Sequence, residues 1–203
     1  MLLELLSGTG SIGKAFRAQG WDVLSLDSDP RGNPTFCCDL TEWDYTCLDD
    51  VDAIWASPPC TFYSIAGRSV VTTPEQLEAS NNLVRKVLEI HRHIGEEIPI
   101  FIENPFTGSL KHQGLLEHLS LRRVDYCSYG LPYRKRTAIW TNTAWTPARS
   151  LCDRHSCHAC VDGKHTARAQ RGEPGPCYGV RTLYRLPPSL CEEIADYCTA
   201  SII

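Results

Sequence analysis

Short apolar runs alternate with helix-compatible stretches along most of the chain. Apolar segments bounded by turn-forming residues predict strands at 2–6, 21–26, 35–40, 51–56, 98–102, 126–130 and 137–141. Apolar residues at helical spacing predict helices over 14–19, 74–97, 115–119 and 187–200. Strands that alternate with helices in this way predict an α/β fold, with a mostly parallel sheet and helices on both of its faces.

The segment 150–179 interrupts this alternation. It is rich in Cys, His and Gly, and neither the helical nor the strand period extends through it. The chain has 203 residues, of which 42% are hydrophobic, and this is enough for one core. We therefore expect one main domain, formed by residues 1–149 and 180–203, and one small Cys/His-rich insertion at 150–179.

Basic residues are concentrated in the second half of the chain. The net charge is −4, but the segment from Arg122 to Arg185 contains twelve Lys and Arg against four Asp and Glu. A basic stretch on an acidic body suits the phosphate backbone of a nucleic acid, although a merely solvated basic face would have the same composition. The charge pattern makes nucleic acid a candidate partner.

The chain has no segment typical of membrane insertion or secretion. No apolar run approaches the roughly 20 residues that cross a bilayer, and no basic leader precedes the first apolar run. Eleven cysteines are present, but an odd count without a signal peptide favours reduced thiols over a disulfide framework. We expect a soluble intracellular protein without a membrane partner, in the cytoplasm or nucleus of the cell or of an infected host.

A glycine-rich turn follows the first expected strand. The pattern Gly8-x-Gly10-x-x-Gly13 lets a ligand approach the backbone, and Asp27 ends the next strand, where a carboxylate can accept hydrogen bonds from ribose hydroxyls. The turn predicts a cofactor that contains a nucleotide. Taken alone it fits a nicotinamide-dinucleotide oxidoreductase equally well, and a tight turn without a ligand would have the same sequence.

Two side chains with catalytic potential follow two later core strands. Ser57-Pro58-Pro59-Cys60 follows 51–56, and the prolines hold Cys60 rigidly at the edge where α/β sheets bind ligands, so its thiol is a candidate nucleophile. Glu103-Asn104 follows 98–102 and reaches the same edge, which makes Glu103 a candidate general acid. The alternatives are an inert buried cysteine and a carboxylate that caps a helix or pairs with an arginine.

The order of these motifs resembles that of the C5-cytosine DNA methyltransferase family, in a small form suited to a virus or phage. The matching segments are 5–10, Pro58-Pro59-Cys60, Glu103-Asn104, 129–136 and 184–190. The resemblance implies a Rossmann-like fold that binds S-adenosylmethionine, and an enzyme that methylates carbon 5 of a cytosine flipped out of DNA. A dinucleotide oxidoreductase would not explain Pro-Pro-Cys together with Glu-Asn.

The resemblance also assigns roles to individual residues. Cys60 would attack carbon 6 of the base, Glu103 would donate to ring N3, and Arg134 or Arg136 would hold the base oxygen. The cofactor contacts it implies are Ser7, Gly8, Thr9, Gly10 and Ser11 around the methionine part, Asp27 at the ribose, Asp39 at the adenine amino group, and Pro58.

Three positions depart from the family pattern. Leu6 stands where the family usually has an aromatic residue, and Pro105 stands where it often has Val. The sequence Tyr-Arg-Lys-Arg at 133–136 is shorter than the Gln-x-Arg-x-Arg of the family. Which of Arg134, Lys135 and Arg136 contacts the base is therefore open.

The insertion carries a second candidate site. Cys152, Cys157, Cys160 and His165 lie within fourteen residues, a mixture and density suited to a tetrahedral zinc ion. The rival ligands are His155, His158 and Cys177. A cluster of reduced cysteines without a metal is another interpretation, because the spacing is not that of the usual zinc fingers.

The family inserts its target-recognition region at this point of the chain. We therefore expect 150–179 to be a small, zinc-stapled recognition element. The basic side chains expected to contact phosphates are Arg149, Arg154, Lys164, Arg168 and Arg171.

Two other functions are compatible with these motifs. An RNA cytosine methyltransferase would use the same cysteine chemistry, and no residue distinguishes an RNA substrate from a DNA substrate. A non-catalytic, zinc-containing nucleic-acid binder would keep the fold, but the intact Cys60 and Glu103 argue against it. The oligomeric state and the flanking-sequence preference leave no signal in the sequence.

Overall fold

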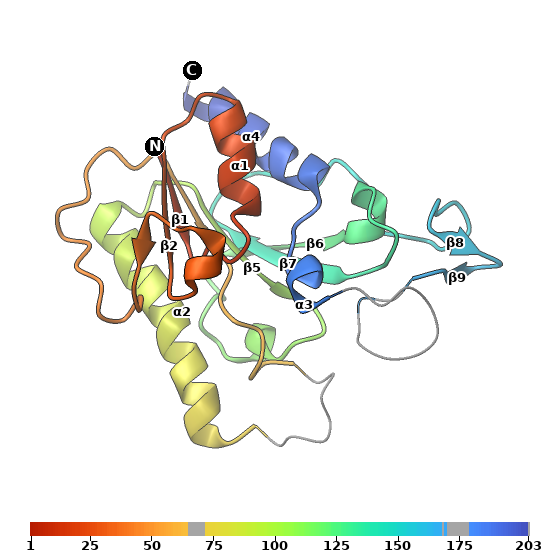
Figure 1. The fold of residues 1–203 in the computed structure, drawn as a ribbon, viewed down its shortest axis with the longest axis horizontal. Helices are drawn as coiled ribbons and strands as arrows, with labels where there is room; N and C mark the ends of the chain where they lie inside the picture. The colour runs from red at the N-terminus through yellow and green to blue at the C-terminus, as the bar shows by residue number, and fades with distance from the viewer. Residues whose placement is uncertain (65–71, 168, 170–178, 203) are drawn as a thin grey trace.

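The computed structural model of the chain describes residues 1–64, 72–167, 169 and 179–202. Its main element is a seven-stranded sheet in the order β3-β2-β1-β4-β5-β7-β6 (Figure 1). The strands are β1 (Leu2–Leu5), β2 (Val23–Asp27), β3 (Phe36–Cys37), β4 (Ala53–Ala56), β5 (Ile100–Pro105), β6 (Ser120–Asp125) and β7 (Arg136–Thr141). The helices are α1 (Ser11–Ala18), α2 (Pro74–Ile94), α3 (Val180–Leu183) and α4 (Pro188–Ile202), with 3₁₀ turns η1 (Pro30–Gly32), η2 (Leu110–His112) and η3 (Tyr126–Tyr129).

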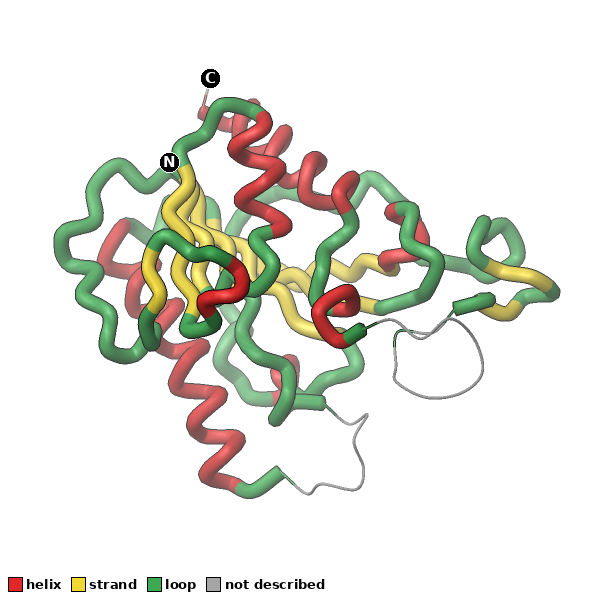
Figure 2. Tube along the Cα trace, viewed as in Figure 1, coloured by secondary structure: helices red, strands yellow, loops and turns green. Residues whose placement is uncertain are grey.

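The sheet is mostly parallel, as predicted. The pairs β1–β2, β1–β4, β2–β3 and β4–β5 are parallel, whereas β7 runs antiparallel between β5 and β6. Figure 2 shows the strands of the sheet in yellow, side by side. The first five strands have the order of a doubly wound nucleotide-binding sheet, in which the order reverses between β1 and β4. Ligands of such sheets bind beyond the carboxyl ends of the strands at that reversal.

Helices cover both faces of the sheet, which confirms the expected layers. α1 and α4 lie side by side on one face, where Trp21 Nε1, just after α1, donates to Thr199 Oγ1 of α4 over 2.8 Å, and α2 covers the other face (Figure 1). Alternate residues of β1 face the two cores, since Leu2 packs beneath α1 and α4 while Leu3 and Leu5 pack beneath α2. The central strands are buried on both faces, and this explains why β4 is apolar throughout and why β1 is apolar except at Glu4.

The longest helix, α2, begins where its sequence predicts. Thr73 Oγ1 accepts a hydrogen bond from Gln76 N, the Gln76 side chain accepts one from Thr73 N, and Pro74 occupies the first turn. The helix ends at Ile94, earlier than the predicted 97, because Gly95 follows at φ 148°, a backbone conformation that favours glycine.

Three segments of the second half differ from the prediction. Residues 115–119 form a turn rather than a helix, because Gly114 at φ 72° precedes them and β6 begins directly after them. Residues 126–129 form η3 rather than a strand, and Gly130 at φ 94° ends it. β6 is absent from the prediction, because tandem arginines interrupt its apolar alternation and it lies at the edge of the sheet.

The insertion contains a hairpin that projects away from the main sheet (Figure 1). Its strands β8 (Cys160–Val161) and β9 (Lys164–His165) pair antiparallel, and the two residues between them, Asp162 and Gly163, have φ values of 50° and 71°. Positive φ at both positions is what a two-residue type I′ turn requires. Among the described residues of 150–179, Ala159 and Ala167 are the buried apolar side chains, so this segment has little core of its own.

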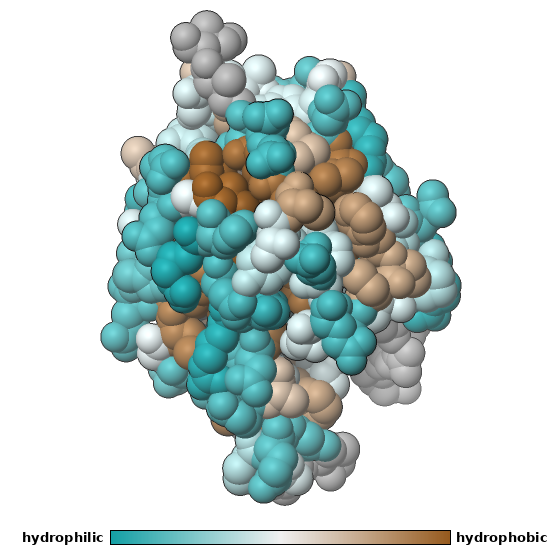
Figure 3. All heavy atoms as spheres, turned by 90° about the vertical axis from the view of Figure 1, so that its left-hand side faces the viewer, coloured by the Kyte–Doolittle hydropathy of each residue, from teal (hydrophilic) through white to brown (hydrophobic). Residues whose placement is uncertain are grey.

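Within the part of the chain that the structure describes, no helix has the length and apolar character needed to span a membrane. The face drawn in Figure 3 is mostly hydrophilic, with apolar groups in separate patches. The exposed large apolar side chains among the described residues, Phe36, Val161 and Tyr184, lie in three different parts of the chain. Scattered exposure of this kind is usual for a protein surface.

Candidate active site

Cys60 lies at the carboxyl edge of the sheet, shortly after β4. Pro58 and Pro59 restrict the backbone before it. Asn104 Nδ2 donates a hydrogen bond to Pro58 O over 2.8 Å, and Tyr63 N donates one to Cys60 O over 3.1 Å. The half-buried thiol is therefore carried by a loop that is fixed on both sides of Cys60.

Glu103 lies one strand away, near the end of β5. The register pairs Ala56 of β4 with Ile102 of β5, so Glu103 is the first residue beyond that pair. Its side chain is only 9% exposed, and its Oε1 accepts a hydrogen bond from Tyr126 OH over 3.2 Å and lies 3.8 Å from Lys135 Nζ. These partners fix the orientation of the carboxyl group, as a proton donor to a base in the cleft requires.

Lys135 is the cation beside Glu103. Its Nζ lies 4.9 Å from the centroid of the Tyr126 ring and donates to Leu183 O over 3.4 Å. Successive side chains of an extended segment point to opposite sides, so the side of the chain that presents Lys135 does not present its two neighbours. Of the three cations, Lys135 is therefore the one on the side that faces Glu103.

The two neighbouring arginines are engaged elsewhere. Arg136 forms a bidentate ion pair with the buried Asp125, with its Nε 3.0 Å from Oδ1 and its terminal nitrogen 2.7 Å from Oδ2. Arg134 is half-buried and lies near His165 of the insertion. The pKa of His165 is lowered mainly by burial of its ring and next by the positive charge of Arg134. Of the three cations at 134–136, Lys135 is thus the one paired with Glu103.

The charges around Cys60 oppose one another. Burial raises the pKa of the Cys60 thiol above its ordinary value of 9.0, the positive charge of Lys135 lowers it, and the negative charge of Glu103 raises it. Because the net direction is upward, the neutral thiol is the dominant form near pH 7. Its proton must leave as the sulfur attacks, and Lys135 is the side chain that favours the thiolate.

The glycine loop joins β1 to α1 through three residues in the left-handed region. Leu6, Gly8 and Gly10 have φ values of 54°, 54° and 65°. The space beside Gly8 and Gly10 contains no protein atoms, because a Cβ at either position would have no neighbour within 4 Å. Asp27, at the end of β2, accepts hydrogen bonds from Gly8 N and Asp29 N, each over 2.7 Å. An open backbone and a strand-end carboxylate therefore lie together, as the sequence predicts.

Gly13, the third glycine of the motif, has a packing role. It lies in α1 against Glu4 of β1, and a Cβ at Gly13 would lie 2.4 Å from Glu4 Oε2. This close approach of helix and strand is the function of the third glycine in nucleotide-binding turns. Glu4 is 1% exposed, and burial raises its pKa to about 7.

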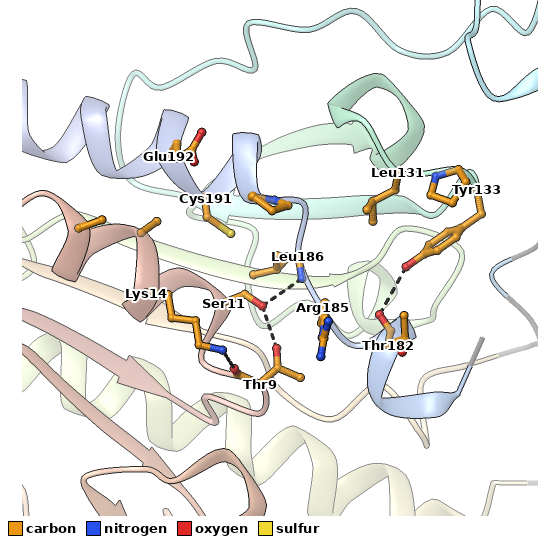
Figure 4. Close-up of a pocket in the computed structure, with 14 residues that line it drawn as sticks. Thr9, Ser11, Lys14, Leu131, Tyr133, Thr182, Arg185, Leu186, Cys191 and Glu192 are labelled. Carbon is orange, nitrogen blue, oxygen red and sulfur yellow. Dashed lines mark hydrogen bonds between the residues drawn. The ribbon is translucent and has the colours of Figure 1, made fainter.

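A cavity of about 600 Å³ adjoins the glycine loop (Figure 4). It is bounded by α1, the segment 131–133 and the residues between α3 and α4. Thr9 and Ser11 line it, and Ser11 Oγ accepts a hydrogen bond from Leu186 N over 3.3 Å. The other cofactor residues expected from the sequence, and both Cys60 and Glu103, lie outside its lining.

Asp39 follows β3, the outermost strand next to β2, at the carboxyl edge of the parallel strands. It is exposed and accepts hydrogen bonds from Thr41 N over 2.8 Å and from Thr41 Oγ1 over 2.7 Å, and these bonds lower its pKa. In the order β3-β2-β1-β4, the carboxyl ends of successive strands thus carry Asp39, Asp27, the glycine loop and Cys60.

A second group of reactive side chains lies where η3 meets the segment 152–165. The ligand atoms of Cys127, Cys152, Cys157 and His165 all lie within 4.8 Å of one another. Cys127, which belongs to η3, is absent from the ligand set predicted from the sequence. All cysteines among the described residues are free thiols.

The other predicted ligands lie outside this group. Cys160 is next to it, with its N donating to Cys157 O over 2.9 Å, but its thiol does not belong to the set within 4.8 Å. His155 and His158 are exposed. Cys177 lies outside the residues that the structure describes.

A curated relative decides the family. The chain is 30% identical over 221 residues to the probable DNA (cytosine-5)-methyltransferase of Frog virus 3 (isolate Goorha), and the match covers 97% of this chain and 99% of that protein. The chain belongs to the DNA (cytosine-5)-methyltransferase family. No protein-family model matches it.

Two solved methyltransferase structures match part of the chain. The structure of S. pombe Dnmt2 methyltransferase matches with a TM-score of 0.48 and 17% identity over 71% of this chain. The Entamoeba histolytica methyltransferase EhMeth matches with a TM-score of 0.49 and 15% identity over 74% of this chain. The chain covers 52% and 57% of these two proteins, so it spans about half of their length.

The methyltransferase motifs meet at one edge of the sheet. Cys60, Glu103 and Lys135 gather beyond β4 and β5, while Asp27 and the glycine loop lie beyond β2 and β1. Alternation along an extended segment separates Lys135 from Arg134 and Arg136, but only the structure shows that the side with Lys135 faces Glu103. The sequence contained no local signal for Cys127, which is far from the other thiols of the metal-ligand cluster along the chain.

Proposed function

We propose that this chain transfers a methyl group from S-adenosylmethionine to carbon 5 of cytosine in DNA through a covalent bond to Cys60. The observation that carries the proposal is the meeting of Cys60, Glu103 and Lys135 at the carboxyl edge of β4 and β5, in a member of the DNA (cytosine-5)-methyltransferase family. A thiol, a carboxyl group and a cation are the groups that activation of a cytosine ring requires.

Each group has one task in this reaction. Cys60 Sγ loses its proton to water and bonds to carbon 6 of the ring, which makes carbon 5 nucleophilic. Glu103 donates a proton to ring N3 as negative charge develops there, and Lys135 faces the base oxygen in place of an arginine. S-adenosylmethionine, when bound, supplies the methyl group to carbon 5. A base then takes the proton from carbon 5, N3 returns its proton to Glu103, and the ring double bond re-forms as Cys60 leaves as the thiolate.

The residues at the glycine loop fit this cofactor. The open backbone at Gly8 and Gly10 admits the methionine part, and Asp27 at the end of β2 suits the ribose hydroxyls. Thr9 and Ser11 line the adjoining cavity, and Asp39 lies two strands from the loop, at the position proposed for the adenine amino group. Ser7 and Pro58 complete the proposed set.

The insertion supplies cations for the nucleic-acid backbone. Arg154 and Lys164 of the insertion, together with Arg149 just before it, are exposed and extend the basic character of the chain beyond the site. Arg168 and Arg171, which we also expect to contact phosphates, lie outside the described residues. Because ring attack occurs face-on, the cytosine must leave the duplex stack to reach Cys60.

Transfer of a labelled methyl group tests this function. The purified protein is incubated with methyl-labelled S-adenosylmethionine and duplex DNA, or with RNA of the same sequence, and 5-methylcytosine is measured after digestion. We expect label in DNA with wild-type protein and with Cys47→Ser, which removes an exposed thiol after β3, and none with Cys60→Ser. Label in RNA alone would replace DNA as the substrate, and label in DNA with Cys60→Ser would refute the cysteine mechanism.

A further inference from the structure

The cluster of metal-ligating side chains joins two parts of the chain. Cys127 belongs to η3, which follows β6 in the main domain, whereas Cys152, Cys157 and His165 belong to the insertion. Three thiols and one imidazole, with all ligand atoms within 4.8 Å of one another, are a complete set for a four-coordinate ion.

The distances within the cluster fit zinc. The Sγ atoms of Cys152 and Cys157 each lie 3.6 Å from His165 Nε2. A tetrahedral zinc ion with ordinary bonds to sulfur and nitrogen separates these two kinds of ligand atom by about 3.6 Å. An ion can therefore enter the cluster with little movement of these side chains.

The chemistry of the donors selects the metal. Thiolate and imidazole ligands favour zinc over magnesium and calcium, which prefer oxygen. Cys127 is buried and the other three ligands are half-buried. Four protein ligands leave no open position for a substrate, and this is the pattern of a structural zinc site rather than a catalytic one.

We propose that this chain binds one Zn²⁺ through Cys127, Cys152, Cys157 and His165, and that the ion fastens the insertion to the main domain. The insertion needs such a link, because its hairpin strands have two residues each and Val161 is 62% exposed. A segment with so little buried apolar surface gains its folding energy from the metal.

The zinc site is connected to the active-site cation through one buried carboxylate. Asp125 accepts a hydrogen bond from Cys152 N over 3.0 Å, and it is also the ion-pair partner of Arg136, the residue after Lys135. Loss of the ion would free the insertion and loosen the segment that positions Lys135. This consequence for catalysis rests on the proposed function, whereas zinc binding does not.

The assignment of Cys127 in place of Cys160 gives the proposal a sharp test. Wild-type protein, Cys127→Ser and Cys160→Ser are purified from zinc-supplemented medium, and zinc is measured by elemental mass spectrometry. We expect about one zinc per chain in the wild type and in Cys160→Ser. Cys127→Ser should bind Zn²⁺ more than about 100-fold more weakly, since even the loss of a group that supports a ligand costs 10–100-fold.

Folding of each variant is checked by circular dichroism, and Cys127→His serves as a second variant. Histidine is itself a zinc ligand, so we expect it to retain the metal and the fold where serine does not. Trypsin cleavage after Arg154 and Lys164 provides an independent readout, and we expect it to accelerate in Cys127→Ser and in chelator-treated wild type. Wild-type protein without zinc, or loss of zinc in Cys160→Ser but not in Cys127→Ser, would overturn the proposal.

These measurements use neither DNA nor S-adenosylmethionine. A chain that binds zinc but transfers no methyl group would keep this site and refute the proposed function. A chain that methylates DNA and holds no zinc would do the reverse.

Discussion

The side chain of Asn104 donates a hydrogen bond from Nδ2 to the carbonyl oxygen of Pro58 over 2.8 Å, in a position without solvent contact. This bond ties the end of β5 to the loop that presents Cys60. We expect Asn104→Ala to lower kcat about 10- to 100-fold, because misplacement of a nucleophile by about 1 Å has an effect of this size. S-adenosylmethionine affinity should change little, since the glycine loop is on a different strand.

The matched control for this change is Asn82→Ala on α2, which alters an exposed asparagine whose side chain accepts a hydrogen bond from Arg85. Steady-state kinetics and cofactor binding by calorimetry are measured for both variants. Equal kcat values for Asn104→Ala and Asn82→Ala would show that the bond does not position the nucleophile.

Lys135 should control the reactivity of Cys60. The pKa of this thiol lies above 9.0, so its alkylation by iodoacetamide should rise roughly tenfold per pH unit between pH 7 and pH 9. The charge of Lys135 lowers that pKa, so Lys135→Gln should raise it and slow alkylation at every pH in this range, whereas Lys135→Arg should not. Peptide mass spectrometry follows Cys60, with Cys47 of the same molecule as the internal control. Unchanged labelling of Cys60 in Lys135→Gln would remove Lys135 from the site.

Arg136 should affect stability where Lys135 affects chemistry. Its partner Asp125 has a fully buried side chain, and an unpaired buried charge costs about 3–5 kcal/mol. We therefore expect Arg136→Ala to lower the free energy of unfolding in urea by about this amount, with Arg134→Ala as the milder control. A stable but inactive Arg136→Ala would mean that Arg136, rather than Lys135, contacts the base.

Glu4 should make stability depend on pH. Burial raises its pKa to about 7 from an ordinary 4.5, so the folded state favours the neutral acid. This contribution is fully present below about pH 4.5 and is lost as pH rises through 7, with a total of at most about 3 kcal/mol. We expect the free energy of unfolding to fall between pH 5 and pH 8 in wild type and in the exposed control Glu117→Gln, and to fall less in Glu4→Gln. Parallel pH profiles for all three proteins would contradict this account.

The sequence was sufficient for the parallel half of the fold. Strands β1, β4 and β5 are buried on both faces, so their apolar runs predict them directly, and Thr73 with Gln76 marks the start of α2. The antiparallel half was harder. β6 is a partly exposed edge strand with tandem arginines, and the aromatic residues of 126–129 have strand-like composition but turn before Gly130.

The chemistry of the site was predictable only where it is local in sequence. Cys60 follows one recognisable strand and Glu103 lies near the end of the next, so parallel pairing brings them to one edge. Cys127 depends on tertiary contact, because η3 must fold back against the insertion before its thiol meets Cys152. No spacing rule within 150–179 could have included it.

Covalent capture of the enzyme by its substrate tests the central claim most directly. Duplex DNA that contains 5-fluorocytosine is incubated with S-adenosylmethionine and wild-type protein, Cys60→Ser or Cys47→Ser, and adducts that survive denaturation are mapped by mass spectrometry. Fluorine cannot leave carbon 5 as a proton does, so the account predicts a stable DNA adduct on Cys60 in wild type and Cys47→Ser, and none in Cys60→Ser. Absence of an adduct in protein that binds both cofactor and DNA, or an adduct on another residue, would contradict it.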